Sequence, residues 1–178
     1  MKQFILFACL VFTIGCNNTG NDLNEKELKV LTAILGEFES SSPGENEKWK
    51  MLIHPSLVNM NLSEDIKKYF GEYEIMDEII KSLKKEQQNK VINPSFFQKD
   101  AIHEIIPRPF PNRLPELPSK DTLYLMFSQV GFDKSENFAL VLLHLGMASL
   151  NAWNTIYFLK RDENNDYIII DKKTISIS

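Results

Sequence analysis

The apolar positions of residues 24–38 recur at the spacing of an α-helix, in steps of three and four residues. The residues that share this face are Leu28, Leu31, Ile34, Leu35 and Phe38. Asn24 precedes the apolar run and Glu27 follows three residues later, which is the arrangement of an N-cap and its partner in a capping box. The pattern therefore predicts a helix over residues 24–38.

The rest of the first two thirds of the chain contains three further predicted elements. Residues 48–54 alternate between apolar and polar side chains, which predicts a short strand ended by Pro55. A helical pattern begins at Ser63, is interrupted at Gly71 and continues to about residue 88. Apolar side chains near residues 95–105 predict a short helix. The five prolines that follow, between residues 107 and 118, predict a crossing loop because proline ends helices and central strands.

The last third of the chain changes to β-rich runs separated by short polar turns. The runs are residues 122–132, 138–146, 153–161 and 167–177. Short connections favour antiparallel neighbours. The second run is apolar on both faces except at His144, which predicts an interior strand covered by helices on at least one side. Gly131, near the end of the first run, predicts a bulge or a close backbone approach.

These elements predict an α+β fold in which N-terminal helices and one short strand pack on a C-terminal four-stranded antiparallel meander. The expected organisation is a signal peptide over residues 1–15, a tether over residues 16–23 and a single α+β domain over residues 24–178. The acidic segment 162–166 resembles the start of a calcium loop, but Tyr167 and Lys173 occupy two of its required positions. A hairpin turn centred on Asn164 and Asn165 is the better prediction.

The first sixteen residues resemble the signal of a bacterial lipoprotein. Lys2 precedes an uncharged apolar stretch from Phe4 to Ile14, which is too short to span a bilayer. Gly15 and Cys16 follow, as in a lipobox whose cysteine is linked through its sulfur to diacylglycerol and becomes the mature N-terminus. We therefore expect acylation, such as with palmitate, at Cys16 and a protein held on the membrane by its lipid.

Composition excludes several classes of function. Removing residues 1–15 removes one lysine and no acid, so the formal charge moves from −4 to −5, which argues against nucleic acid as a partner. No basic stripe is predicted on a helix, which argues against strong attraction to anionic headgroups. The only cysteines are Cys9 and Cys16, so the domain has no thiol for a disulfide, a nucleophile or a zinc ribbon.

Part of the C-terminal region resembles a family of bacterial exported proteins of unknown activity. The similarity rests on Ser128-Gln-Val-Gly-Phe-Asp133, on the run Ala139-Leu-Val-Leu-Leu143 and on the later strand Tyr157-Phe-Leu-Lys-Arg161. Members read Ser-Arg-Val-Gly-Phe-Asn and Ala-Leu-Val-Tyr-Val at the first two places. The family often carries Cys-Gly-x-x-Cys-Gly between two core strands, where this chain has residues 146–152 without a thiol. The resemblance implies a compatible fold over most of the domain and no particular activity.

The three histidines are the first candidates for chemistry. His103 is followed by Pro107 where a zinc-binding helix needs its second histidine, so we expect a surface side chain on a short helix. His144 is expected to be a neutral imidazole that hydrogen-bonds a neighbour, and His54 a turn residue. The sequence predicts no catalytic residue, no metal ligand and no cofactor.

The proline-rich crossing is the candidate partner surface. Its prolines pre-order an extended segment, which lowers the entropy lost on binding. Arg108, Phe110 and Arg113 are of the types that often anchor interfaces. The alternative is that Phe110 packs into the core and the segment only connects helix to sheet.

Three functional hypotheses remain open. The first is a non-enzymatic envelope lipoprotein, bound to the membrane through Cys16, in the outer membrane if the cell is Gram-negative, that binds an unidentified protein partner. The second is an envelope hydrolase whose site is assembled around His103 or His144, which requires a histidine in a cleft near a carboxylate and a hydroxyl. The third is an inhibitor or immunity lipoprotein against a secreted toxin.

Overall fold

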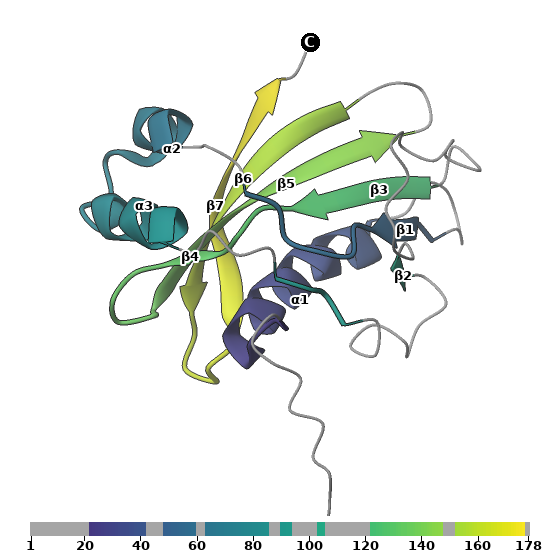
Figure 1. The fold of residues 1–178 in the computed structure, drawn as a ribbon, viewed down its shortest axis with the longest axis horizontal. Helices are drawn as coiled ribbons and strands as arrows, with labels where there is room; N and C mark the ends of the chain where they lie inside the picture. Colours follow the sequence, from purple (N-terminus) through teal and green to yellow (C-terminus); the bar gives the residue numbers. More distant parts are fainter. Residues whose placement is uncertain are drawn as a thin grey trace, which may run out of the picture.

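The structure is a computed structural model that describes residues 22–41, 48–59, 63–85, 90–93, 103–105, 122–147 and 152–176 (Figure 1). Its helices are α1 (Glu25–Ser40), α2 (Ser63–Phe70) and α3 (Met76–Lys85). Its strands are β1 (Lys50–Ile53), β2 (His103–Ile105), β3 (Thr122–Phe127), β4 (Gly131–Phe132), β5 (Phe138–Met147), β6 (Ala152–Arg161) and β7 (Tyr167–Ser176). The fold is α+β, as predicted.

The strands form one sheet in the order β2-β1-β3-β5-β6-β7, and β4 also pairs with β5. The C-terminal pairs β3/β5, β4/β5, β5/β6 and β6/β7 are antiparallel, which confirms the predicted arrangement. The sheet is nevertheless larger than the predicted four strands. β1 runs parallel to both β2 and β3, and the long connection that contains α2 and α3 lets the chain return in the same direction.

The predicted helix near residues 95–105 is wrong at its C-terminal end. His103–Ile105 is strand β2, in parallel register with β1, where His103 pairs with Met51. A short apolar run does not distinguish a strand from a helix, and the open edge of β1 offers this segment backbone partners. The earlier residues of that predicted helix lie outside the described residues.

The predicted strand 122–132 is interrupted. Phe127 pairs with Leu143, and Gly131 pairs with Leu140. Residues 128–130 therefore oppose only residues 141–142 of β5, as in a β-bulge. The hydroxyl of Ser128 lies in the bulge and accepts the N–H of Leu142 at 2.9 Å. The Ser128 side chain therefore satisfies a backbone donor of β5 at the bulge.

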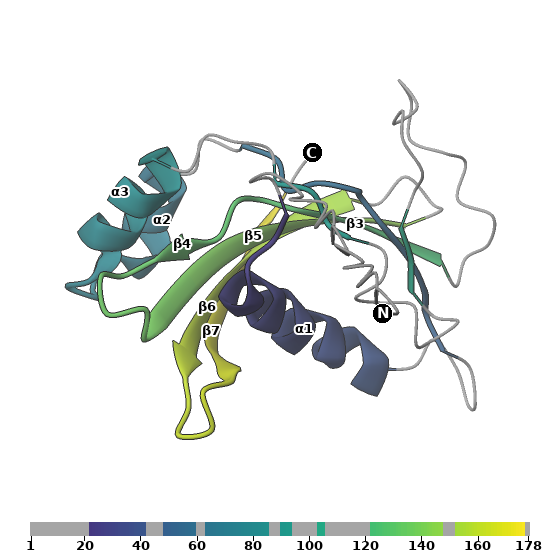
Figure 2. The ribbon, with the colours of Figure 1, turned by 60° about the horizontal axis from the view of Figure 1, so that its bottom comes forward.

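Strand β5 is the centre of two cores, one on each face of the sheet. Its residues Val141 and Leu143 pack with α1, whereas Leu140 and Leu142 pack with α2 and α3. Figure 2 shows α1 on one face of the curved sheet and the α2/α3 pair on the other. The double-sided apolar pattern of β5 thus has helices behind both faces.

Gly131 makes the close approach that its position predicts. A Cβ atom there would lie 2.6 Å from Cγ of Leu83 and 3.0 Å from both Cγ2 and the carbonyl oxygen of Ile79. Both neighbours belong to α3, so the absence of a side chain at Gly131 lets this helix lie directly on β4.

Two local predictions are also confirmed. Helix α2 ends at Phe70, immediately before Gly71, and a separate helix begins at Met76. The segment between β6 and β7 is a hairpin turn: Asn165 has a φ of 64° and the N–H of Asp162 donates to the carbonyl oxygen of Asp166 at 2.8 Å. The Asp162 carboxylate accepts the N–H groups of Asn164 and Asp166, so it closes the turn.

Candidate functional site

A groove of about 780 Å³ lies between the start of α1, helix α3 and the turn that joins β4 to β5. Its size is within the usual range of small-molecule pockets, roughly 300–1,000 Å³. Val130 and Phe132 contribute apolar surface, and most of the other lining side chains are charged. We refer to this cavity as the N-terminal groove.

The first wall of the N-terminal groove is the start of α1, which is held by the predicted capping box. The side chain of Asn24 accepts the N–H of Glu27 at 2.9 Å, and the N–H of Asn24 donates to Oε2 of Glu27 at 3.0 Å. Oε1 of Glu27 accepts a charged hydrogen bond from Lys90 at 2.7 Å. Glu27 is only 1% exposed, so its two oxygens fix both the helix start and Lys90.

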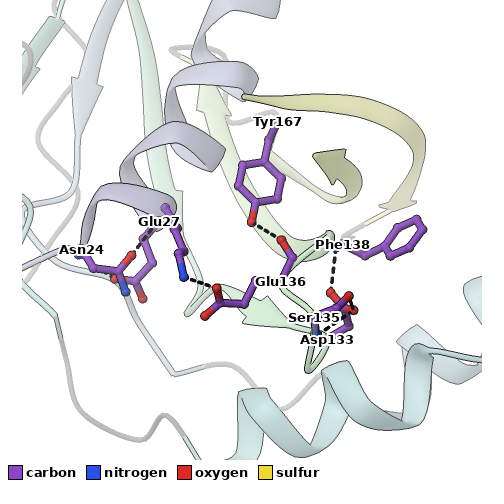
Figure 3. A network of polar contacts seen from close by, with 8 residues as sticks. Asn24, Glu27, Asp133, Ser135, Glu136, Phe138 and Tyr167 are labelled. Atoms are coloured by element: carbon purple, nitrogen blue, oxygen red, sulfur yellow. Dashed lines mark hydrogen bonds and ion pairs between the residues drawn. The ribbon is translucent and has the colours of Figure 1, made fainter. Parts of the chain in front are cut away.

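The second wall is the turn 133–137 (Figure 3). Asp133 is buried, and its carboxylate accepts the N–H of Phe138 at 2.7 Å and the N–H and hydroxyl of Ser135. Glu136 has a φ of 56°, its carbonyl oxygen accepts the hydroxyl of Tyr167 at 2.7 Å, and its carboxylate pairs with Lys26 of α1. The Lys26 pair joins the first wall to the second.

The third wall is α3. Glu78 pairs with Lys134 at 3.0 Å, and the hydrogen bond from that lysine side chain lowers the pKa of Glu78 from its ordinary value of 4.5. Ser82 accepts the N–H of Phe132 at 3.3 Å and so holds β4 against the helix. Lys81 and Lys85, one helical turn apart, also line the groove. These two lysines share their wall with Glu78 and do not make a basic stripe along α3.

A short backbone segment ties the chain before α1 to the sheet. Val91 forms bridges with Asp22 and with Ser56, and its carbonyl oxygen accepts the N–H of Leu23 at 3.3 Å. The carbonyl oxygen of the neighbouring Lys90 accepts the N–H of Leu57 at 2.9 Å. The chain is thus already fixed to the domain at Asp22, beside the N-terminal groove.

The two histidines whose side chains the structure describes, His54 and His144, do not assemble a hydrolytic site with the other described residues. Nδ1 of His144 lies 2.9 Å from the amide oxygen of Asn154, so this side chain hydrogen-bonds a neighbour, as predicted. Nδ1 of His54 lies 2.7 Å from the carbonyl oxygen of Ser56, in the turn after β1, which agrees with its predicted role. Neither side chain lines the N-terminal groove. The backbone of His103 is in β2 rather than in a helix.

The predicted anchor and partner residues lie outside the described residues. These are Cys16, Arg108, Phe110 and Arg113. The described side chains contain no group of three or more histidine, cysteine, aspartate or glutamate residues that could hold a metal ion. Within the same described segments, no helix has both the length and the apolar character needed to cross a bilayer.

Comparison of the chain with protein-family models, with curated proteins and with solved structures found no match.

The N-terminal groove was not predicted from the sequence. The spacing of Lys81 and Lys85 on a predicted helix is a signal that could have indicated one wall. The capping box of Asn24 and Glu27 was predicted, but as helix structure only. No local pattern connects Glu27 to Lys90 or Lys26 to Glu136, because these partners lie 63 and 110 positions apart.

Proposed function

We propose that the chain is an envelope lipoprotein, anchored through Cys16, that acts as a binding module rather than as an enzyme. We further propose that the N-terminal groove is its ligand site. The observation that carries this proposal is the construction of the groove. Three ion pairs join its walls to each other and to Lys90, so the charged lining is pre-organised before a ligand arrives.

The position of the groove supports the same function. Asn24 lines the groove and stands eight positions after Cys16. Eight residues extend at most about 28 Å, so a lipid on Cys16 would keep the groove close to the membrane surface. A ligand carried by the membrane, or by a protein bound to it, would meet the groove at high local concentration.

A binding role is preferred over the hydrolase because of the partner of His144. General-base chemistry needs an imidazole within reach of the proton it removes, oriented by a further group. The described partner of His144 is an amide oxygen on the adjacent strand, away from the groove lining. This arrangement suits a structural hydrogen bond between β5 and β6.

Site-specific photocrosslinking in cells tests the proposed ligand site. A benzophenone amino acid is placed at Glu25, which lines the groove, or at Thr32, which is exposed on the same helix and does not line it. We expect a discrete crosslinked product from position 25 and none from position 32. Equal products at the two positions, or no product at position 25, would contradict the assignment of the groove as the ligand site.

A further inference from the structure

The charges of the N-terminal groove are not distributed evenly. The lining contains five lysines and five acids, so its formal charge is zero. Glu27, Glu78 and Glu136 are each paired with a lysine, and the Asp133 carboxylate accepts hydrogen bonds from its own turn. Glu25 is 83% exposed and lies 3.7 Å from Lys29. The acids are therefore engaged by the protein itself.

Two of the lysines are different. Lys81 and Lys85 are exposed, and their ammonium groups have no hydrogen-bond or ion-pair partner in the part of the chain that the structure describes. They stand four residues apart on α3, so their Cβ atoms are about 6 Å apart and both ammonium groups can reach one anion. Although the lining as a whole is neutral, one wall of the groove thus presents two ammonium groups that no described side chain pairs with directly.

We propose that the N-terminal groove binds a phosphate group between Lys81 and Lys85. This inference deepens the proposed binding function and rests on it for the identity of the site. A phosphoester carries a charge of about −1 to −2 near neutral pH and three or more oxygens, so one group can neutralise both lysines. Lysine binds phosphate as a point charge and does not need the planar geometry of arginine.

Helix stability alone accounts for only part of this lysine pattern. Cations near a helix C-terminus are favourable, and Lys84 and Lys85 both occupy the last turn of α3. Lys84 does not line the groove, whereas Lys85 does. Lys81 lies a turn earlier, where the helix dipole offers less, and it also lines the groove. Lys84 is therefore a control that separates helix stabilisation from ligand binding.

The test uses the full chain in uncharged maltoside micelles at low ionic strength, with glycerol 3-phosphate as the probe and phosphorus NMR as the readout. We expect saturable binding whose Kd rises about tenfold in the double variant Lys81→Ala/Lys85→Ala. The charge-matched control is Lys48→Ala/Lys84→Ala, two exposed lysines that do not line the groove, and we expect its Kd to stay within about twofold of the parent. The charge-retaining variant Lys81→Arg/Lys85→Arg should bind as the parent does.

Three results would overturn the inference: no saturable binding by the parent chain, an equal loss in the two alanine variants, or equal binding of acetate and glycerol 3-phosphate. A second probe, glycerophosphoglycerol, distinguishes the source of the phosphate. Binding of this diester at least as tight as that of the monoester assigns the groove to a lipid headgroup, and preference for the monoester assigns it to a soluble phosphoester. If the purified chain carries no lipid on Cys16 but still binds phosphate, the proposed anchoring is rejected and the proposed phosphate site stands.

Discussion

The centre of the sheet and the N-terminal groove are built in opposite ways. Around β5, apolar side chains from consecutive antiparallel strands pack against helices on both faces, and residues such as Val141 and Leu142 are completely buried. In the groove, charged side chains from segments far apart in the sequence pair with one another. The comparison teaches that apolar packing holds the sheet centre, whereas the groove uses some of its charges for structure and leaves Lys81 and Lys85 without a polar partner among the described residues.

Truncation in the sheet centre should have the largest effect. Leu142→Ala removes a fully buried side chain from the core beneath α2 and α3, and we expect a loss of about 2–5 kcal/mol in the free energy of unfolding. Urea denaturation measures it. Ile168→Ala is the matched control, because Ile168 is 49% exposed and should change stability by less than about 0.5 kcal/mol. Similar losses in the two variants would refute the description of this core.

The next largest effect should come from the buried ion pair of the groove. Lys90→Met leaves the carboxylate of Glu27 buried without its cationic partner, which should cost about 3 kcal/mol. Lys26→Met breaks the more exposed pair with Glu136 and should cost about 1 kcal/mol or less. Chemical denaturation measures the free energy of unfolding of both variants. If the two substitutions cost the same, burial does not distinguish these pairs.

The contact between the two regions can be tested at Gly131. Gly131→Val would drive side-chain atoms into Leu83 and Ile79, and we expect a loss of about 1–3 kcal/mol. Gly36→Ala is the control, since nothing lies within 4 Å of a Cβ at this helical position and alanine should stabilise α1 by roughly 0.5–1 kcal/mol. We expect chemical denaturation to show a lower free energy of unfolding for Gly131→Val and a higher one for Gly36→Ala. An unchanged midpoint in Gly131→Val would contradict the close approach of α3.

The smallest effect concerns the rim of the groove. The folded-state pKa of Glu78 lies below its ordinary value of 4.5, so its pair with Lys134 favours the folded state above that pH. This contribution is lost as the pH falls through the lowered pKa. Carbon NMR titration of the Glu78 carboxyl group should give a pKa below 4.5, and Lys134→Ala should move it back towards 4.5. A value that does not respond to Lys134→Ala would exclude the ion pair as the cause.

How much of the fold the sequence predicts depends on the distance between partners. The start of α1, the break at Gly71, the hairpin at Asn165 and the interior position of β5 all follow from local patterns, and all are present. The parallel edge of β1 and β2 was not predicted. Parallel pairing depends on long connections, and a three-residue segment such as His103-Glu104-Ile105 is too short for its pattern to distinguish a strand from a helix.

The groove was missed for a related reason. Each of its ion pairs joins segments that only the folded sheet brings together, and charged residues on a helix are usually solvated. The predicted chemistry centres on the histidines, because histidine titrates near neutral pH and can act as acid, base or ligand. In the structure, His144 hydrogen-bonds Asn154 on the adjacent strand, and lysines and acids come together in the N-terminal groove.

The central claim is that a lipid on Cys16 holds this domain, with its charged groove, at the membrane surface. The most direct measurement is metabolic labelling with an alkyne analogue of palmitate, followed by purification of the parent chain and of Cys16→Ala. We predict strong incorporation in the parent and none in Cys16→Ala, because the thioether can form only at that sulfur. Equal labelling of the two proteins, or no labelling of the parent, would contradict the account.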